Sequence, residues 1–243
     1  MIAGTESYLR RIHWLKNTRT IPEWERMGIA HGFEGKGYTL PKNGLSLNQV
    51  HGDTIHSVHG AADLPREPLE GDGLFSSVPQ QLIAVKTADC VPILIASPEG
   101  VWALHAGWKG LSGNILGRAL TSYRGKMSEL HVAIGPCIGL EAFEVGPEVI
   151  AGFRTGAFHM NEVEFAFASS KGHSDRWHLD LGMLAALQLQ RFEVPPEQVS
   201  VVRMCTYRHA EQLHSFRRDA SAAGRNWSWI AFKERNVDRR SGW

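Results

Sequence analysis

Two histidines and one cysteine stand out because their side chains can bind a metal ion or act as nucleophile and base. His51, Cys90 and His105 each lie where an apolar run gives way to a turn that contains glycine or aspartate. Clefts are often built at such strand ends. Two imidazoles and one thiolate suit zinc, and three protein ligands leave a fourth position for water or substrate. The sequence therefore offers a candidate catalytic zinc site.

The same three residues allow other chemistry. Cys90 could be the nucleophile of a cysteine hydrolase that acts on cell-wall peptide, with His51 or His105 as its base. No short metal-ligand spacing such as CxxC joins the three residues, so a buried cysteine and hydrogen-bonded histidines are an alternative. A non-enzymatic protein that binds metal through His51, His56 and His59 also stays open. Copper-dependent polyphenol oxidation is disfavoured, because the 12 histidines include no His-x-His pair.

Short strands in the middle of the chain must position these side chains. Residues 81–86, 92–96 and 101–105 are apolar runs, which predict buried strands, and Ser97-Pro98-Glu99-Gly100 predicts a hairpin turn. Further strands are predicted at residues 131–134, 199–204 and 227–232, and helices at residues 115–123 and 177–191. Because strands and helices alternate irregularly, we predict an α+β fold with mixed β-sheets. Without a repeat or a clear linker, residues 1–243 are expected to form a single domain.

Composition excludes several classes of protein. The chain has 243 residues, 21% of them charged, and a formal net charge of +1, so no strong field would attract nucleic acid or an anionic membrane. Three cysteines are too few for a disulfide framework, and the N-terminus lacks the pattern of a signal peptide. We therefore expect a cytoplasmic protein with no nucleic-acid or membrane partner, as a monomer or a homodimer.

Several short motifs, in order, resemble those of the YfiH-like polyphenol oxidase/laccase-domain family. The resemblance runs from about residue 31 to about residue 230 and is specific because so many segments match. One departure follows His31-Gly32-Phe33, where Glu34-Gly35-Lys36 replaces the family's usual segment and removes an arginine that could contact substrate. The matching segments are residues 48–52, 71–74, 87–92, 105–110, 134–139, 143–145, 205–206, 215–219 and 224–225.

The resemblance implies a fold, a metal site and an activity. It implies a compact α/β/β/α-layered domain and places the family's zinc ligands on His51, Cys90 and His105. Members are described as purine nucleoside phosphorylases with adenosine deaminase activity. We therefore expect zinc rather than copper, and phosphorolysis of adenosine, inosine and methylthioadenosine, with the nucleoside and phosphate as small-molecule partners.

Further residues near these motifs are candidates for contacts with substrate. Asp89 either orients a ligand or serves as general base beside the metal, or else it caps backbone amides in a turn. Lys109 opens a predicted helix, which suits phosphate binding. Arginine can clamp phosphate or stack on a purine. The remaining candidate substrate-binding residues are Asn48, Gln49, Arg217 and Arg218.

Overall fold

A seven-stranded mixed sheet forms the centre of the molecule. The computed structural model describes residues 4–63, 67–159, 166–169 and 175–231. The order of the strands across this large sheet is β1-β12-β8-β6-β7-β4-β3. The pairs β1·β12, β12·β8 and β3·β4 are parallel, and the others are antiparallel. The bounds are β1 His13–Leu15, β3 Ile55–Val58, β4 Gly73–Ser76, β6 Val91–Ser97, β7 Gly100–Ala106, β8 His131–Ile134 and β12 Val199–Val202.

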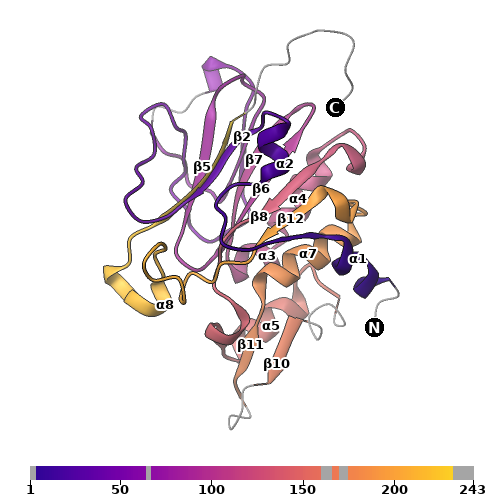
Figure 1. The fold of residues 1–243 in the computed structure, drawn as a ribbon, viewed down its shortest axis with the longest axis vertical. Coiled ribbons are helices and arrows are strands. Elements are labelled where there is room, and N and C mark those ends of the chain that lie inside the picture. Colours follow the sequence, from indigo (N-terminus) through magenta and orange to yellow (C-terminus); the bar gives the residue numbers. More distant parts are fainter. Residues whose placement is uncertain (1–3, 64–66, 160–165, 170–174, 232–243) are drawn as a thin grey trace.

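The other strands of the described residues form two three-stranded antiparallel sheets. The first has the order β2-β13-β5 and joins a strand near the end of the described chain to two early ones. The second has the order β10-β11-β9, and β10 and β11 project from the lower end of the molecule in Figure 1. The bounds are β2 Ala30–Glu34, β5 Leu82–Thr87, β13 Asn226–Ala231, β9 Glu144–Val145, β10 Phe167–Ser169 and β11 Trp177–Leu179.

The helices gather mainly on the face of the large sheet that is turned away from β2-β13-β5. Helices α4 and α7 contact β7 and β8 there, whereas β5 and β13 contact β6 and β7 from the opposite face (Figure 1). The α-helices are α1 Thr5–Arg11, α2 Pro22–Arg26, α3 Trp108–Ser112, α4 Ile115–Ser122, α5 Pro147–Thr155, α7 Leu181–Arg191 and α8 Phe216–Asp219. The 3-10 helices are η1 Ala61–Asp63, η2 Met127–Glu129, η3 Leu140–Ala142, η4 Pro196–Gln198 and η5 Ala220–Ala222.

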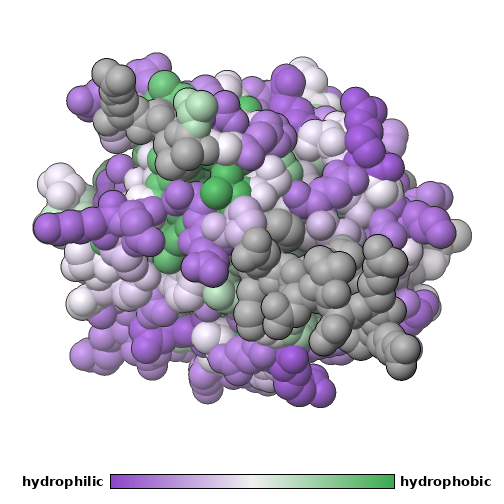
Figure 2. Space-filling view, turned by 90° about the horizontal axis from the view of Figure 1, so that it is seen from above, coloured by the Kyte–Doolittle hydropathy of each residue, from purple (hydrophilic) through white to green (hydrophobic). Residues whose placement is uncertain are grey.

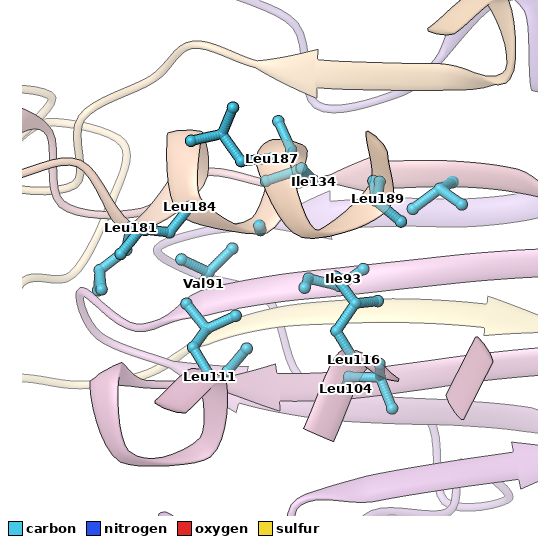
Figure 3. Packing of buried hydrophobic residues seen from close by; sticks show 14 of the residues in the cluster. Val91, Ile93, Leu104, Leu111, Leu116, Ile134, Leu181, Leu184, Leu187 and Leu189 are labelled. Atoms are coloured by element: carbon cyan, nitrogen blue, oxygen red, sulfur yellow. The ribbon is translucent and has the colours of Figure 1, made fainter. Parts of the chain in front are cut away.

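Both faces of the large sheet are covered, and this explains its continuous apolar runs. In β6, Ile93 and Ile95 pack in the core under the helices, whereas Leu94 packs between the two sheets. Successive side chains of a strand point to opposite faces, so a strand covered on both sides needs apolar residues at every position. Figure 3 shows Leu184 and Leu187 of α7 above the sheet residues of the helix-side core. The prediction of an α+β fold with mixed sheets is confirmed.

One predicted helix is wrong at its start. Residues 177–191 were expected to form one helix, but Trp177–Leu179 is strand β11 and the helix begins at Leu181. The cause is Asp180, whose side chain accepts the Met183 N–H at 2.9 Å and caps α7. The predicted strands in the middle of the chain and the hairpin turn between β6 and β7 are confirmed.

Hydrophilic residues cover most of the face seen in Figure 2, and hydrophobic residues gather in one smaller area of it. The buried apolar side chains form two clusters, one under the helices and one between the two sheets. None of the helices in the described residues has the length and apolar character that crossing a bilayer requires.

Candidate metal centre

His51, Cys90 and His105 meet at one end of the space between the two sheets. Their donor atoms all lie within 4.8 Å of one another, and within the described residues they form the one group of three or more His, Cys, Asp or Glu that could hold a metal ion. Cys90 lies in the turn between β5 and β6, and His105 lies near the end of β7. His51 was expected at a strand end, but it lies in a loop before β3.

Asp72 organises two of these three residues. Its buried carboxylate accepts Nδ1–H of His105 at 2.7 Å and the backbone N–H groups of Val50, His51 and Gly52 at 3.3, 2.9 and 2.6 Å. Because the carboxylate accepts from Nδ1, the proton of neutral His105 stays on that nitrogen and Nε2 is free for a metal. One carboxylate thus sets both the orientation of His105 and the path of the loop that carries His51.

The loop that carries His51 needs this support because its backbone is unusual. His51 has φ of 62°, in the left-handed region that residues other than glycine seldom adopt. Such conformations persist where the surroundings over-determine them, and they cluster at functional sites. The bonds from Asp72 supply that constraint. His51 is exposed, Cys90 is half-buried and His105 is 3% exposed, so the group opens to solvent on the His51 side.

The charges of the group suit a cation. Burial by itself would raise the pKa of the Cys90 thiol, but hydrogen bonds from His105 and His51 outweigh it and lower this pKa to about 7. Burial would likewise lower the pKa of His105, but Asp72 and Cys90 raise it to about 9. A thiolate is therefore accessible near neutral pH, and thiolate is the form of cysteine that binds metals.

The donor set and the space around it fit a zinc ion. Tetrahedral zinc with bonds of about 2.0 to 2.3 Å needs donor atoms roughly 3.5 Å apart, so small side-chain rotations would close the group. Gly107 leaves the room, because a Cβ at that position would lie 2.9 Å from Cys90 Sγ and 3.4 Å from the ring of His51. A larger residue at position 107 would press on the Cys90 sulfur and contact the ring of His51.

A cavity of about 450 Å³ opens beside the group and brings cations and aromatic rings to it. Lys86, Arg217 and Arg225 line it, and Asp89 is the acidic residue among its lining residues. Its aromatic lining residues other than the histidines are Trp108, Phe143 and Phe216. Phe216 is 56% exposed, which places this ring where the cavity meets solvent. The cavity is of the size that small-molecule ligands occupy.

Asp89 precedes Cys90, but its carboxylate bonds to other groups. It accepts the Thr206 hydroxyl at 2.6 Å and the backbone N–H of Arg217 at 2.6 Å. The backbone of Asp89 has φ of 94°, which turns the chain sharply before Cys90. Of the roles expected for Asp89, this geometry matches the capping of a backbone amide.

The two neighbouring arginines have different surroundings. Arg217 lines the cavity, donates from Nη2 to the Glu144 carbonyl at 2.9 Å and lies 5.4 Å from the ring centre of Phe143. The guanidinium of Arg218 instead donates hydrogen bonds to the Asp219 carboxylate and to three backbone carbonyls, those of Thr206, Tyr207 and Leu213. Arg217 therefore lines the cavity, whereas Arg218 stabilises the preceding segment, residues 206–213.

The other expected substrate contacts divide in the same way. Asn48 lines the cavity and is exposed. Gln49 also lines it, but its amide is engaged with both backbone groups of Lys86, at 2.7 and 2.8 Å. Lys109 is exposed on the five-residue helix α3 and is not among the residues that line the cavity. Its ammonium lies 5.7 Å from the Trp108 ring centre.

Sequence reasoning assigned no role to four residues that matter here: Asp72, Lys86, Thr206 and Arg225. Asp72, Thr206 and Arg225 stand in segments that carried the family resemblance, which was the available signal. No sequence signal pointed to Lys86, because a lysine at the end of an apolar strand looks the same as a solvent-exposed surface lysine.

Comparison with known proteins places the chain in a family. A family model described as multi-copper polyphenol oxidoreductase laccase matches residues 35–233. The chain is 35% identical over 193 residues to a Shigella flexneri protein named purine nucleoside phosphorylase YfiH, which covers 79% of this chain and 74% of that protein. It is 34% identical over 215 residues to a Deinococcus radiodurans protein named purine nucleoside phosphorylase, with coverages of 86% and 76%.

Solved structures agree with these relatives. The crystal structure of the Bacillus licheniformis hypothetical protein YfiH superposes with a TM-score of 0.73 at 27% identity, covering 79% of this chain and 74% of that one. YlmD from Geobacillus stearothermophilus gives a TM-score of 0.72 at 29% identity, with the same coverages. The chain therefore belongs to the YfiH-like family, the family described as multi-copper polyphenol oxidoreductase laccase.

Proposed function

We propose that this protein is a zinc-dependent purine nucleoside phosphorylase, which converts adenosine, inosine or methylthioadenosine and phosphate to the free base and a ribose 1-phosphate. One observation carries the proposal: a single cavity of about 450 Å³ joins the His51–Cys90–His105 group to three cationic side chains. The names of the relatives from Shigella flexneri and Deinococcus radiodurans support the reaction.

The cationic side chains suit the phosphate. Lys86, Arg217 and Arg225 line the cavity, and the acidic residue among them, Asp89, already accepts two hydrogen bonds from protein groups. The cavity therefore has an excess of positive charge that a phosphate dianion can neutralise. Phosphorolysis develops positive charge on the ribose, as glycoside cleavage does, and a bound dianion beside the sugar would stabilise that charge.

The purine finds its contacts on the other lining residues. Phe143, Phe216 and Trp108 offer ring faces, and aromatic rings stack with nucleobases. Asn48 offers an amide that can both donate and accept hydrogen bonds at the edge of the base. Of these aromatic rings, Phe216 is the most exposed, and we expect its contact with the base to exclude water from the cavity.

His51, Cys90 and His105 would hold the zinc, with Asp72 keeping the proton of His105 on Nδ1. When bound, zinc supplies Lewis-acid polarisation and lowers the pKa of water near it, which suits adenosine deamination as a second activity. Three free cysteines are consistent with action in the reducing cytoplasm, which we include in the proposal.

A cysteine hydrolase is the second candidate, and the lowered pKa of Cys90 beside two histidines favours it. In that reaction Cys90 would attack a carbonyl carbon while His51 or His105 managed the proton. Metal-free protein would then be the active form. Copper-dependent oxidation of phenols has less support, because the described residues hold one three-residue donor group rather than several.

The first experiment is an adenosine assay on purified protein, with and without phosphate, together with metal analysis and a Cys90→Ala variant. Adenine and ribose 1-phosphate that form only with phosphate, and are lost in Cys90→Ala, support the proposal. Inosine formed without phosphate supports deamination. Zinc-loaded protein that gives neither product overturns the nucleoside assignment. Activity that appears only after chelation, on peptide substrates, supports the hydrolase.

A matched pair of lysines tests the place of the phosphate. Lys86→Met removes a cation from the cavity, whereas Lys109→Met removes one outside it. We expect Lys86→Met to raise the KM for phosphate on the order of tenfold, as for the loss of one charge-assisted hydrogen bond, and Lys109→Met to leave it unchanged. Equal effects of the two variants would remove the argument from the cationic side chains.

A further inference from the structure

A second cavity, of about 320 Å³, lies next to the first and contains the two other cysteines. Cys137 and Cys205 both line it, together with Trp14, Met183 and Arg203. Ile138 lines both cavities, so it forms part of the wall between them. Neither thiol belongs to the candidate metal group, and both are free and half-buried. The proposed phosphorylase reaction gives them no role.

The backbone brings these two cysteines side by side. Cys137 and Cys205 are partners in an isolated parallel β-bridge, and the Thr206 N–H donates to the Cys137 carbonyl at 3.0 Å. Chains paired in this way lie about 4.8 Å apart. Disulfides span Cα separations of roughly 4.4 to 6.8 Å, so the two backbones already stand at a suitable distance.

The two thiols differ in their surroundings. The Gly139 N–H donates to Cys205 Sγ at 3.2 Å and so places a positive dipole end at this sulfur. Burial, in contrast, raises the pKa of the Cys137 thiol well above its ordinary value. This difference suits a sequence in which Cys205 reacts first with an incoming reagent and Cys137 follows.

We propose that Cys137 and Cys205 are a redox-active pair that closes to an intramolecular disulfide in response to small disulfides such as oxidised glutathione. Cys205 sulfur attacks one sulfur of oxidised glutathione, and the first glutathione leaves with the Cys205 proton. Cys137 then attacks Cys205 sulfur and expels the second glutathione, which takes the Cys137 proton. Two protein thiols lose two hydrogens and two electrons, and one oxidised glutathione becomes two reduced ones.

Formation of this disulfide would affect the first cavity through the hydrogen bonds of Asp89. Thr206 follows Cys205 and donates its hydroxyl to the Asp89 carboxylate, while Ile138 follows Cys137 and donates its N–H to the Asp89 carbonyl. Asp89 in turn accepts the backbone N–H of Arg217, which lines the first cavity. A shift of either cysteine therefore moves a direct partner of the turn that carries Cys90.

The test is peptide mass mapping of zinc-loaded wild-type protein after incubation with oxidised glutathione and rapid alkylation. We expect a linked pair of peptides that carry Cys137 and Cys205, two hydrogens lighter than the reduced pair, and release by dithiothreitol. In Cys137→Ser the reaction stops at a glutathione adduct on Cys205. Full alkylation of both thiols in oxidised wild-type protein, or oxidation of Cys90 in their place, overturns the proposal.

A second measurement addresses the link to the first cavity and rests on the proposed function. Phosphorolysis by oxidised wild-type protein is expected to fall several-fold and to return with dithiothreitol, whereas the rate of Cys205→Ser does not respond to oxidised glutathione. A linked peptide pair with an unchanged rate overturns the link to the cavity. Mass mapping reads the disulfide without any turnover, so failure of the phosphorylase assignment and failure of the disulfide are distinguishable.

Discussion

Asp72 and Asp89 are two buried carboxylates near the candidate metal group, and they support different parts of the site. Asp72 accepts bonds from His105 and from the loop of His51, so it serves the metal group. Asp89 accepts bonds from Thr206 and from the backbone of Arg217, so it serves the wall that faces substrate. Asp89 stands next to Cys90 in sequence, but Asp72 is the acid bound to a metal-group histidine. Proximity in sequence to Cys90 therefore does not identify the carboxylate that supports the candidate metal group.

Replacing Asp72 should produce the largest effect. In Asp72→Asn one side-chain oxygen can still accept, but the NH₂ group must face two donors. The variant therefore loses either the bonds from His105 and His51 or those from Val50 and Gly52. We expect zinc affinity to fall about 10- to 100-fold, the usual effect of removing a partner of a ligating histidine. Competition with a chromophoric chelator measures it. Unchanged zinc affinity would show that the three ligands position themselves without Asp72.

The reactivity of Cys90 in metal-free protein gives the next largest effect. Its pKa is lowered from 9.0 to about 7, so roughly 50-fold more thiolate is present at pH 7 than for an unperturbed thiol. Iodoacetamide should therefore alkylate Cys90 with a midpoint near pH 7, and Cys137, whose pKa burial raises, should react only at much higher pH. Mass mapping of the alkylated peptides follows both sites, and bound zinc should protect Cys90.

The same pKa shifts predict how the stability of metal-free protein depends on pH. The folded pKa of Cys90 is lowered, so its contribution is complete above pH 9 and is lost as pH falls through about 7. The folded pKa of His105 is raised, so its contribution is complete below pH 6.5 and is lost as pH rises through about 9. The two trends oppose each other, so these residues should change the free energy of unfolding little between pH 7 and 9. Urea titrations at several pH values test this.

Much of the fold could be predicted because its signals are local. Apolar runs identified β5, β6 and β7, and Ser97-Pro98-Glu99-Gly100 identified the hairpin turn between β6 and β7. The predicted helix at residues 177–191 was wrong in its first residues, because short apolar spacings fit a strand and a helix equally well. The parallel pairing of β1 with β12 could not be predicted, since it joins residues far apart in sequence and depends on the packing of the whole sheet.

The candidate site was predictable in its ligands and less so in what surrounds them. His51, Cys90 and His105 carry chemistry that a reader of the sequence looks for, and family motifs join them. Arg217 and Arg218 are indistinguishable in sequence, and only the short helix α8 sends one to the cavity and the other to backbone carbonyls. Asp72 was missed because its partners come from two other segments of the chain.

Replacement of Asp89 should distinguish its role from that of Asp72. In Asp89→Asn the negative charge is lost. The side-chain oxygen can still accept the Arg217 N–H, but the NH₂ group then faces Thr206, whose hydroxyl must turn from donor to acceptor. We expect kcat/KM for the proposed phosphorolysis to fall on the order of tenfold, mainly through KM, while zinc affinity stays at the wild-type value. Steady-state kinetics measure kcat/KM, and the chelator competition used for Asp72→Asn measures the zinc affinity of the same protein as a control. Loss of zinc in Asp89→Asn would erase the distinction between the two acids.

Thr206→Val should give the smallest effect and isolates one bond of the Asp89 network. Valine has nearly the shape of threonine, and Thr206 is fully buried, so the change removes the hydroxyl that donates to Asp89 at 2.6 Å and little else. One acceptor position of a buried carboxylate is then left empty, and we expect a loss of about 1 to 2 kcal/mol in the free energy of unfolding. The backbone N–H of Arg217 still holds the other oxygen of Asp89, so the cavity wall stays in place and KM should rise only by roughly threefold. Urea unfolding and steady-state kinetics on the same preparation measure both quantities. If KM rose as much as in Asp89→Asn, the bond from the Thr206 hydroxyl, and not the bond from the Arg217 N–H, would fix the position of the cavity wall.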